Sequence, residues 1–414
     1  MNTTIIKILL VAGLFGMGAC NPGTKKQAPD HESQEIVYLS DVAVTKPETS
    51  GDKWPVVLFF DAQARGTQFI NAFGLPLSDA GFGVVASNQW KNGTSGALSQ
   101  KIVKKMLGRA ASEGADMNQV YVAGFSGGGR FAQVLAQSGL SVQGVISLGA
   151  GGAAKKEITK PVVSIAGMND FNLREVLQYA LTDQYHEPDL CMVFDGGHEW
   201  PPADVFMAAL SWCKNPGTDL AFSSKDTTLR QLNHYFLLKS KGDNAIQNNP
   251  GIGKQVEPML EQLKMEFAEE LKIQNDLKRN FGTNSKGFWL KWLDQIEQSG
   301  NSMHFQARVR QYMSLLQYMA VDNYIRQKQF AKAEQSLDIY RRIDPRNPDV
   351  EFLAAKRFLK MGKNKVALKK LNEAVEKGYN KYQIISKSEF SRKLSDSNDF
   401  ILTLKQIYPD KKTY

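Results

Sequence analysis

The chain has 414 residues, of which 42% are hydrophobic and 22% charged, and its formal net charge is +9. This balance is typical of a globular protein that buries a large core, and it excludes an intrinsically disordered chain. The length exceeds that of one ordinary core, so we expect more than one structural unit.

The first twenty residues have the pattern of an export signal. Lys7 precedes an apolar run over residues 8–15, and small residues follow up to Cys20. The run is typical of a signal peptide and falls short of the roughly 20 apolar residues that a transmembrane helix needs. The segment Met17-Gly18-Ala19-Cys20 resembles a bacterial lipobox, which implies cleavage before Cys20 and acylation of its thiol. A signal that is cleaved without acylation is the alternative.

On this interpretation residues 1–19 are a lipoprotein signal peptide, and residues 20–34, which are mostly polar, are a flexible tether. We therefore expect a protein of the bacterial cell envelope that a lipid anchors to the membrane.

Residues 35–215 predict an α/β domain with a mainly parallel sheet. Short apolar runs rich in β-branched residues alternate with helical stretches at residues 98–111 and 130–137, which is the pattern of βαβ units. An earlier run over residues 35–44 is predicted to add an antiparallel edge strand. The six runs predicted as the main strands cover residues 56–60, 83–86, 120–125, 142–148, 162–166 and 190–194.

Residues 216–414 predict an all-α domain, because strand signals stop after Pro216 and helical periodicity continues. The charge changes at the same place: residues 21–215 carry 16 Lys and Arg against 19 Asp and Glu, and residues 216–414 carry 34 against 23. The basic half is either a solvated helical surface or a surface for anionic lipid or an acidic partner.

Two helical segments in this half repeat at a spacing of 34 residues, most clearly within residues 314–380. This spacing and the small and large apolar positions resemble the tetratricopeptide repeat, and a generic helical bundle is the alternative. The resemblance implies a surface that binds a protein partner. The aligned positions are Tyr324, Phe330, Ala333, Leu337 and Tyr340 with Phe358, Asn364, Ala367, Leu371 and Ala374.

The segment from Gly124 to Gly128 carries the strongest chemical signal. It reads Gly-Phe-Ser-Gly-Gly, follows an apolar strand and opens a helix. Such a strand–turn–helix exposes the serine on a sharp turn, and the glycines leave room for that turn. Ser126 is therefore the predicted nucleophile.

A serine needs a histidine to accept its proton and a carboxylate to orient that histidine. Of five histidines, His198 follows the last predicted strand, downstream of the serine. Asp170 follows the preceding strand and is the predicted acid, with Asp195 as a rival that is only three residues from the histidine. The order Ser126, Asp170, His198 is that of α/β-hydrolase enzymes.

Backbone N–H groups are expected to stabilise the oxyanion. Gly127 opens the helix after the serine, and Ala62 or Gln63 is expected to supply the second donor from the loop after the strand at 56–60. The alternative for this loop is an Asp61–Arg65 pair that only holds its shape.

These motifs together resemble the α/β-hydrolase superfamily, and within it the polyhydroxybutyrate depolymerase, feruloyl esterase and dienelactone hydrolase group. The resemblance covers about residues 35–215 and implies hydrolysis of carboxylic esters through an acyl-enzyme, with no cofactor and no metal. Trp90, Trp200 and Phe171 are candidates to line an acyl pocket or to pack in the core.

Two other hypotheses remain: an interaction lipoprotein whose hydrolase domain is a non-catalytic scaffold, and a serine peptidase with the same catalytic residues. We expect no nucleic-acid partner. Cys191 and Cys213 are either paired in an exported protein or buried as separate thiols.

Overall fold

The computed structural model describes residues 36–407 apart from 39–40, 48–52, 153–157, 179, 182–188, 223, 282–284, 380–384 and 386–388. The predicted signal peptide, Cys20 and the tether lie outside these residues. Among the helices that are described, none combines the length and the apolar character that crossing a membrane requires. The described chain forms two compact units, residues 36–261 and 262–407, and the boundary falls within helix α8 (Pro250–Arg279).

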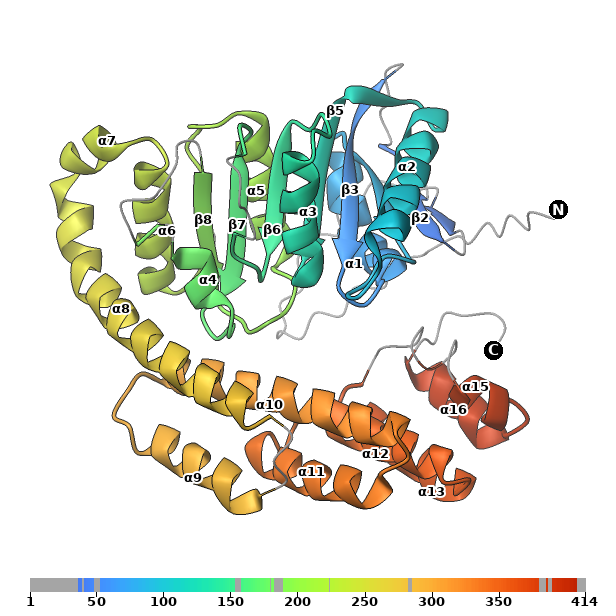
Figure 1. The fold of residues 1–414 in the computed structure, drawn as a ribbon. Coiled ribbons are helices and arrows are strands. Elements are labelled where there is room, and N and C mark those ends of the chain that lie inside the picture. The colour runs from blue at the N-terminus through green and yellow to red at the C-terminus, as the bar shows by residue number, and fades with distance from the viewer. Residues whose placement is uncertain are drawn as a thin grey trace, which may run out of the picture. The chain divides into compact units, whose positions relative to one another are not determined.

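An eight-stranded sheet is the centre of the first unit (Figure 1). From β4 to β8 every neighbouring pair is parallel, which confirms the predicted α/β class with a mainly parallel sheet. The order across the sheet is β1-β2-β4-β3-β5-β6-β7-β8. The strands are β1 (Ile36–Tyr38), β2 (Val42–Thr45), β3 (Trp54–Asp61), β4 (Gly83–Ser87), β5 (Ala115–Phe125), β6 (Gly144–Leu148), β7 (Val162–Gly167) and β8 (Asp189–Phe194).

Most predicted strand bounds agree with the structure to within two residues, and two places differ more. The single edge strand predicted over residues 35–44 is an antiparallel pair, β1 and β2, of which β2 joins the sheet beside β4. Strand β5 begins five residues earlier than its apolar run. Residues 115–119, of which three are polar, continue the extended chain past an irregularity in the register at Trp54 and Val56 of β3.

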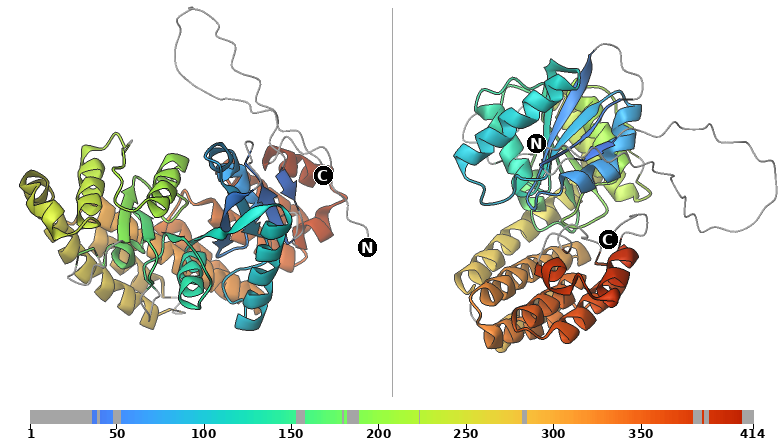
Figure 2. Two further views of the ribbon diagram at one scale, coloured as in Figure 1. Left: turned by 90° about the horizontal axis from the view of Figure 1, so that it is seen from above. Right: turned by 90° about the vertical axis from the view of Figure 1, so that its right-hand side faces the viewer.

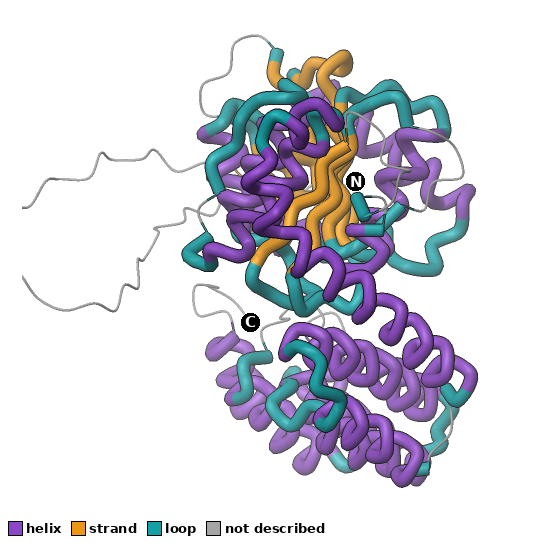
Figure 3. The backbone as a smooth tube through the Cα atoms, turned by 90° about the vertical axis from the view of Figure 1, so that its left-hand side faces the viewer, coloured by secondary structure: helices purple, strands orange, loops and turns teal. Residues whose placement is uncertain are grey.

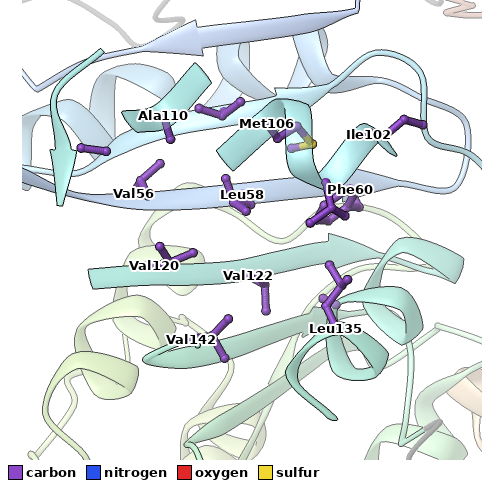
Figure 4. Close-up of a cluster of buried hydrophobic side chains, with 14 of the residues drawn as sticks. Val56, Leu58, Phe60, Ile102, Met106, Ala110, Val120, Val122, Leu135 and Val142 are labelled. Atoms are coloured by element: carbon purple, nitrogen blue, oxygen red, sulfur yellow. The ribbon is translucent and has the colours of Figure 1, made fainter. Parts of the chain in front are cut away.

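Helices cover both faces of the sheet (Figure 3). Alternate residues of a strand point to opposite faces, so β3 supplies two cores. Val56, Leu58 and Phe60 pack with α2 (Gly96–Ser112) and α3 (Gly127–Gln137), as Figure 4 shows. On the other face, the Phe59 ring stacks on Phe69 of α1 (Gly66–Asp79), and Phe206 of α5 (Ala203–Lys214) packs against Phe69.

Helix α6 (Thr227–Lys239) belongs to this first unit, although the sequence boundary was expected at residue 215. Its buried Asn233 accepts a hydrogen bond from the N–H of Val193 and donates one to the Val193 carbonyl, both at 2.8 Å. Val193 lies on β8, the last strand of the sheet in the described chain, so the amide side chain pairs with backbone groups at that edge. Two short helices complete the unit, α4 (Leu173–Leu177) and α7 (Asp243–Gln247).

The second unit is helical, as predicted. Between residues 286 and 376 each helix contacts the next one along the chain, and the orange and red helices in Figure 2 show the arrangement. Besides the later part of α8, they are α9 (Lys286–Glu297), α10 (Met303–Arg326), α11 (Phe330–Ile343), α12 (Pro348–Lys360), α13 (Asn364–Glu376), α15 (Glu389–Leu394) and α16 (Asn398–Ile407).

A buried arginine joins two of these helices. Arg308 of α10 donates from Nε to Glu270 at 2.7 Å and from Nη2 to Glu266 at 2.6 Å, both on α8. Burial opposes the ionisation of Glu266, but hydrogen bonds from the Ser302 N–H and from Arg308 outweigh it and hold the pKa of Glu266 below its usual value. The carboxylate therefore stays charged opposite the guanidinium.

The 34-residue repeat has a structural counterpart in two helix pairs, α10–α11 and α12–α13. Ala333, Leu337 and Tyr340 of α11 are buried, as are Ala367 and Leu371 at the matching positions of α13. The turn inside each pair also repeats. Residues 328 and 362 both have positive φ, and the next N–H in each turn bonds the carbonyl five residues earlier, Gln329 to Tyr324 and Lys363 to Phe358.

Candidate active site

Ser126 lies on a sharp turn between β5 and α3. Its backbone has φ 56° and ψ −119°, a region that residues other than glycine rarely occupy, and its N–H bonds the Leu148 carbonyl at 2.7 Å. Strain of this kind persists only where the surroundings enforce it. The adjacent strand β6 is one such restraint, because Leu148 is its last residue.

The glycines around the serine are required by close backbone contacts. A Cβ on Gly124 would collide with the backbone of Gly128, and a Cβ on Gly128 would collide with the carbonyl of Phe60 at the end of β3. The turn therefore brings α3 against two strands, which matches the physical reason for the glycines in the sequence motif.

Three side chains from separate loops meet at the ends of β5, β7 and β8. His198 Nε2 lies 3.0 Å from Ser126 Oγ, and His198 Nδ1 lies 2.9 Å from Asp170 Oδ1 and 3.0 Å from Oδ2. Asp170 is fully buried, whereas the His198 side chain is 16% exposed. The arrangement can pass a proton from the hydroxyl to the imidazole while the carboxylate faces the other ring nitrogen.

Two residues that the sequence analysis did not single out hold the acid in place. The Asn172 N–H donates to Asp170 Oδ1 at 2.8 Å, and the Asn172 side chain donates to the Gly149 carbonyl at 2.7 Å. Gly149 has φ +56°, and a Cβ there would lie 2.9 Å from Asp170 Oδ2 and 3.1 Å from the His198 ring. An asparagine two residues after an aspartate and a glycine directly after a strand are the available sequence signals, and both are common in ordinary turns.

The imidazole packs against two aromatic rings. The centroids of Phe125 and Phe171 lie 4.7 Å and 4.3 Å from that of His198. Trp200 instead contacts Phe59, Phe69 and other rings of the α1 face, and Trp90 is buried, stacks on Phe131 and donates from its ring nitrogen to Ser99. Of the three pocket candidates, only Phe171 touches the histidine ring in this way, and Trp90 is a core residue.

The Asp61–Arg65 pair is present in the loop after β3. Arg65 donates from Nε to Asp61 Oδ1 at 2.9 Å and from Nη2 to Oδ2 at 2.7 Å, and Asp61 is fully buried. The guanidinium also lies over the rings of Trp200 and Phe125, at 4.6 Å and 5.4 Å from their centroids. The pair therefore connects the loops that follow β3, β5 and β8.

The same loop corrects one expectation for the oxyanion donors. The N–H of Gln63 donates to Asp61 Oδ1 at 2.7 Å, so it is already used by the carboxylate that Arg65 also binds. Gly127 is the first residue of α3, where a backbone N–H has no acceptor within its own helix. Ala62 directly follows β3 and remains the candidate for the second donor.

The alternatives to the predicted acid and base lie elsewhere. Asp195 is exposed, and the contact with His198 is made by Asp170. His234 and His304 are on α6 and α10, and His31 and His186 fall outside the described residues.

Cys191 and Cys213 are both buried as free thiols. Among the described residues there is no group of three or more His, Cys, Asp or Glu side chains that could hold a metal ion.

No family model matches the sequence, and no curated protein matches it. Solved structures with similarity to part of the chain include the S-formylglutathione hydrolase FrmB of Staphylococcus aureus, at 14% identity and a TM-score of 0.37, over 46% of this chain and 100% of that one. Est1E of Butyrivibrio proteoclasticus has 12% identity and a TM-score of 0.32, over 45% and 94%.

An acylaminoacyl peptidase of Pyrococcus horikoshii has 17% identity and a TM-score of 0.32, over 46% of this chain and 41% of that one. This chain therefore spans about two fifths of the peptidase. Similarities of this size do not assign an activity. The strand order and the placement of a serine, an acid and a histidine after β5, β7 and β8 are those of an α/β-hydrolase fold.

Proposed function

We propose that the protein is a serine hydrolase that cleaves carboxylic esters through an acyl-enzyme. The observation that carries the proposal is the continuous contact from Ser126 Oγ through both ring nitrogens of His198 to the buried carboxylate of Asp170. A serine is activated by a base only when that base is itself oriented, and here three loops far apart in the sequence supply the three groups.

In the proposed reaction Ser126 Oγ attacks the carbonyl carbon of the ester, and its proton moves to His198 Nε2. The carbonyl oxygen becomes an oxyanion that accepts hydrogen bonds from the N–H groups of Gly127 and Ala62. The tetrahedral intermediate collapses, the C–O bond to the alcohol breaks, and His198 returns the proton to the departing alcohol. Water then attacks the acyl-enzyme in the same way and releases the acid.

A fluorophosphonate probe tests the nucleophile. We expect covalent labelling of the wild-type protein at Ser126, with no labelling of Ser126→Ala and a strongly reduced rate for His198→Ala. Asp195→Asn is the matched control because Asp195 is exposed, and it should label like the wild type. A folded wild-type protein that stays unlabelled would favour the scaffold hypothesis instead.

A substrate panel distinguishes ester from peptide cleavage. We expect p-nitrophenyl or feruloyl esters to be hydrolysed with a higher kcat/KM than aminoacyl amides. The reverse order would assign the protein to the serine peptidases.

The lipid anchor at Cys20 remains part of the proposal and rests on the lipobox-like sequence alone. Growth with a labelled fatty acid should label the protein, and Cys20→Ala should abolish that labelling. Incorporation that is the same in both proteins would contradict the anchor.

A further inference from the structure

The loop after β4 places a polar side chain beside the proposed oxyanion site. The N–H of Asn92 donates to the carbonyl of Ala62 at 3.0 Å, and the neighbouring Lys91 forms a β-bridge with Gln63. A turn closed by Thr94, whose hydroxyl donates to the Lys91 carbonyl at 2.7 Å, fixes this segment. Asn92 is thus held against the loop that carries the proposed donor Ala62.

The side chain of Asn92 lies against Gly127, the residue of the other proposed donor. Its Oδ1 lies 1.8 Å and its Nδ2 3.1 Å from the place where a Cβ on Gly127 would be. The residue after the serine lacks a side chain, and a carboxamide from 35 positions earlier fills the space instead. Asn92 is exposed, and among the described residues its carboxamide makes no hydrogen bond.

We propose that Asn92 is a catalytic residue that donates a side-chain hydrogen bond to the oxyanion, alongside the N–H groups of Ala62 and Gly127. This inference rests on the proposed ester hydrolysis. The observation that supports it is that the Asn92 backbone is bonded to Ala62 while its carboxamide lies against Gly127 with no other hydrogen-bond partner among the described residues.

The carboxamide must rotate to take this role. In the free protein the oxygen faces the N-terminus of α3, where the first N–H groups give a positive potential. An oxyanion at the same place reverses the sign of the local charge. The terminal torsion of asparagine is soft, so the carboxamide can turn its Nδ2–H toward the negative oxygen.

Two substitutions separate hydrogen-bond donation from shape. Asn92→Ala removes the carboxamide, and Asn92→Asp keeps its shape but replaces the donor by a negative charge. On the fastest ester substrate we expect kcat to fall about 10- to 100-fold in Asn92→Ala, because losing one oxyanion donor costs at least this much in other hydrolases, and KM to change little. Asn92→Asp should lose more than Asn92→Ala. Gln89→Ala, an exposed amide on the same loop, should behave as wild type.

A packing role makes a different prediction. If Asn92 only filled space beside Gly127, the double variant Asn92→Ala/Gly127→Ala would restore both the melting temperature and kcat. We expect it to keep the low kcat of Asn92→Ala.

Asn92→Ala with kcat and KM within twofold of wild type, in a protein whose Ser126 reacts normally with fluorophosphonate, overturns the role of Asn92 alone. A wild-type protein that neither labels at Ser126 nor cleaves esters overturns both this role and the proposed function.

Discussion

The active-site geometry depends on the absence of a side chain at Gly149. A Cβ at this position would lie within 3.1 Å of both Asp170 and His198. Real Cβ atoms seldom approach neighbours this closely, so either the carboxylate or the imidazole must move. A displacement of the base by a fraction of an ångström weakens its hydrogen bond to the serine.

We therefore predict that Gly149→Ala lowers kcat at least tenfold on ester substrates and slows fluorophosphonate labelling. Gly139→Ala is the matched control, since Gly139 also has positive φ (90°) but no atom within 4 Å of its Cβ position. Both variants should lose about 1 kcal/mol of stability from backbone strain. Equal activity in the two variants would show that the site tolerates the added methyl group.

The two cysteines are predicted to be unreactive in the folded protein. Burial raises the pKa of Cys191 to about 12 and raises the pKa of Cys213 as well, so both remain neutral thiols at physiological pH. We expect a thiol reagent at pH 8 to modify neither residue until the protein is unfolded. Rapid modification under native conditions would contradict their burial.

The raised pKa values also predict how the stability of the protein changes with pH. A thiol whose pKa is higher in the folded protein ionises first in the unfolded chain, which stabilises the unfolded chain. The contribution of the thiol to the free energy of unfolding is therefore complete below about pH 9 and is lost as the pH rises above that value. We therefore expect the free energy of unfolding of Cys191→Ala or Cys213→Ala to fall less between pH 7 and alkaline pH than that of the wild type.

At the scale of the elements, the helix pairs repeat their turn as well as their packing. Lys328 and Gly362 occupy equivalent places, 34 residues apart, and have φ 59° and 75°. An L side chain is strained in this conformation and glycine is not. The first repeat thus keeps a lysine where the second has the residue that the backbone favours.

We predict that Lys328→Gly stabilises the helical unit by about 0.5–1 kcal/mol and that Gly362→Lys destabilises it by a similar amount. Both side-chain positions are exposed, so packing should change little. Urea unfolding followed by circular dichroism measures the two effects. A loss of stability in Lys328→Gly would mean that the lysine makes a compensating interaction.

At the scale of the whole molecule, the boundary between the units decides what can be removed. Leu229, Leu232 and Phe236 of α6 are buried within the first unit, and Asn233 pairs with the open edge of β8. A chain cut after residue 215 would lose these contacts and expose a strand edge, which promotes aggregation.

We predict that a chain ending at residue 261 stays soluble, unfolds cooperatively and reacts with fluorophosphonate, whereas a chain ending at residue 215 aggregates. Asn233→Ala in the full chain tests the cause, since leaving the Val193 groups without their partner should cost about 1–3 kcal/mol. A folded, reactive protein from the shorter cut would show that the sheet does not need α6.

Local sequence determined much of this protein. Periodicity distinguished strands from helices, because each element buries its own apolar face, and the glycines around Ser126 marked a turn whose geometry is local. Asp170 and His198 each follow a predicted parallel strand, and the ends of such strands share one edge of a sheet. Their positions in the sequence therefore predicted that both lie near Ser126.

Tertiary structure decided what depends on contacts between distant segments. Four features join a side chain or backbone group to a neighbour whose position the rest of the fold sets. They are the bond from the Gln63 N–H to Asp61, the space that Gly149 leaves, the carboxamide of Asn92 beside Gly127 and the pairing of Asn233 with β8. The boundary at residue 215 was misplaced for the same reason, because the amphipathic pattern of α6 shows that it packs against something and only the folded chain shows that it packs against the sheet.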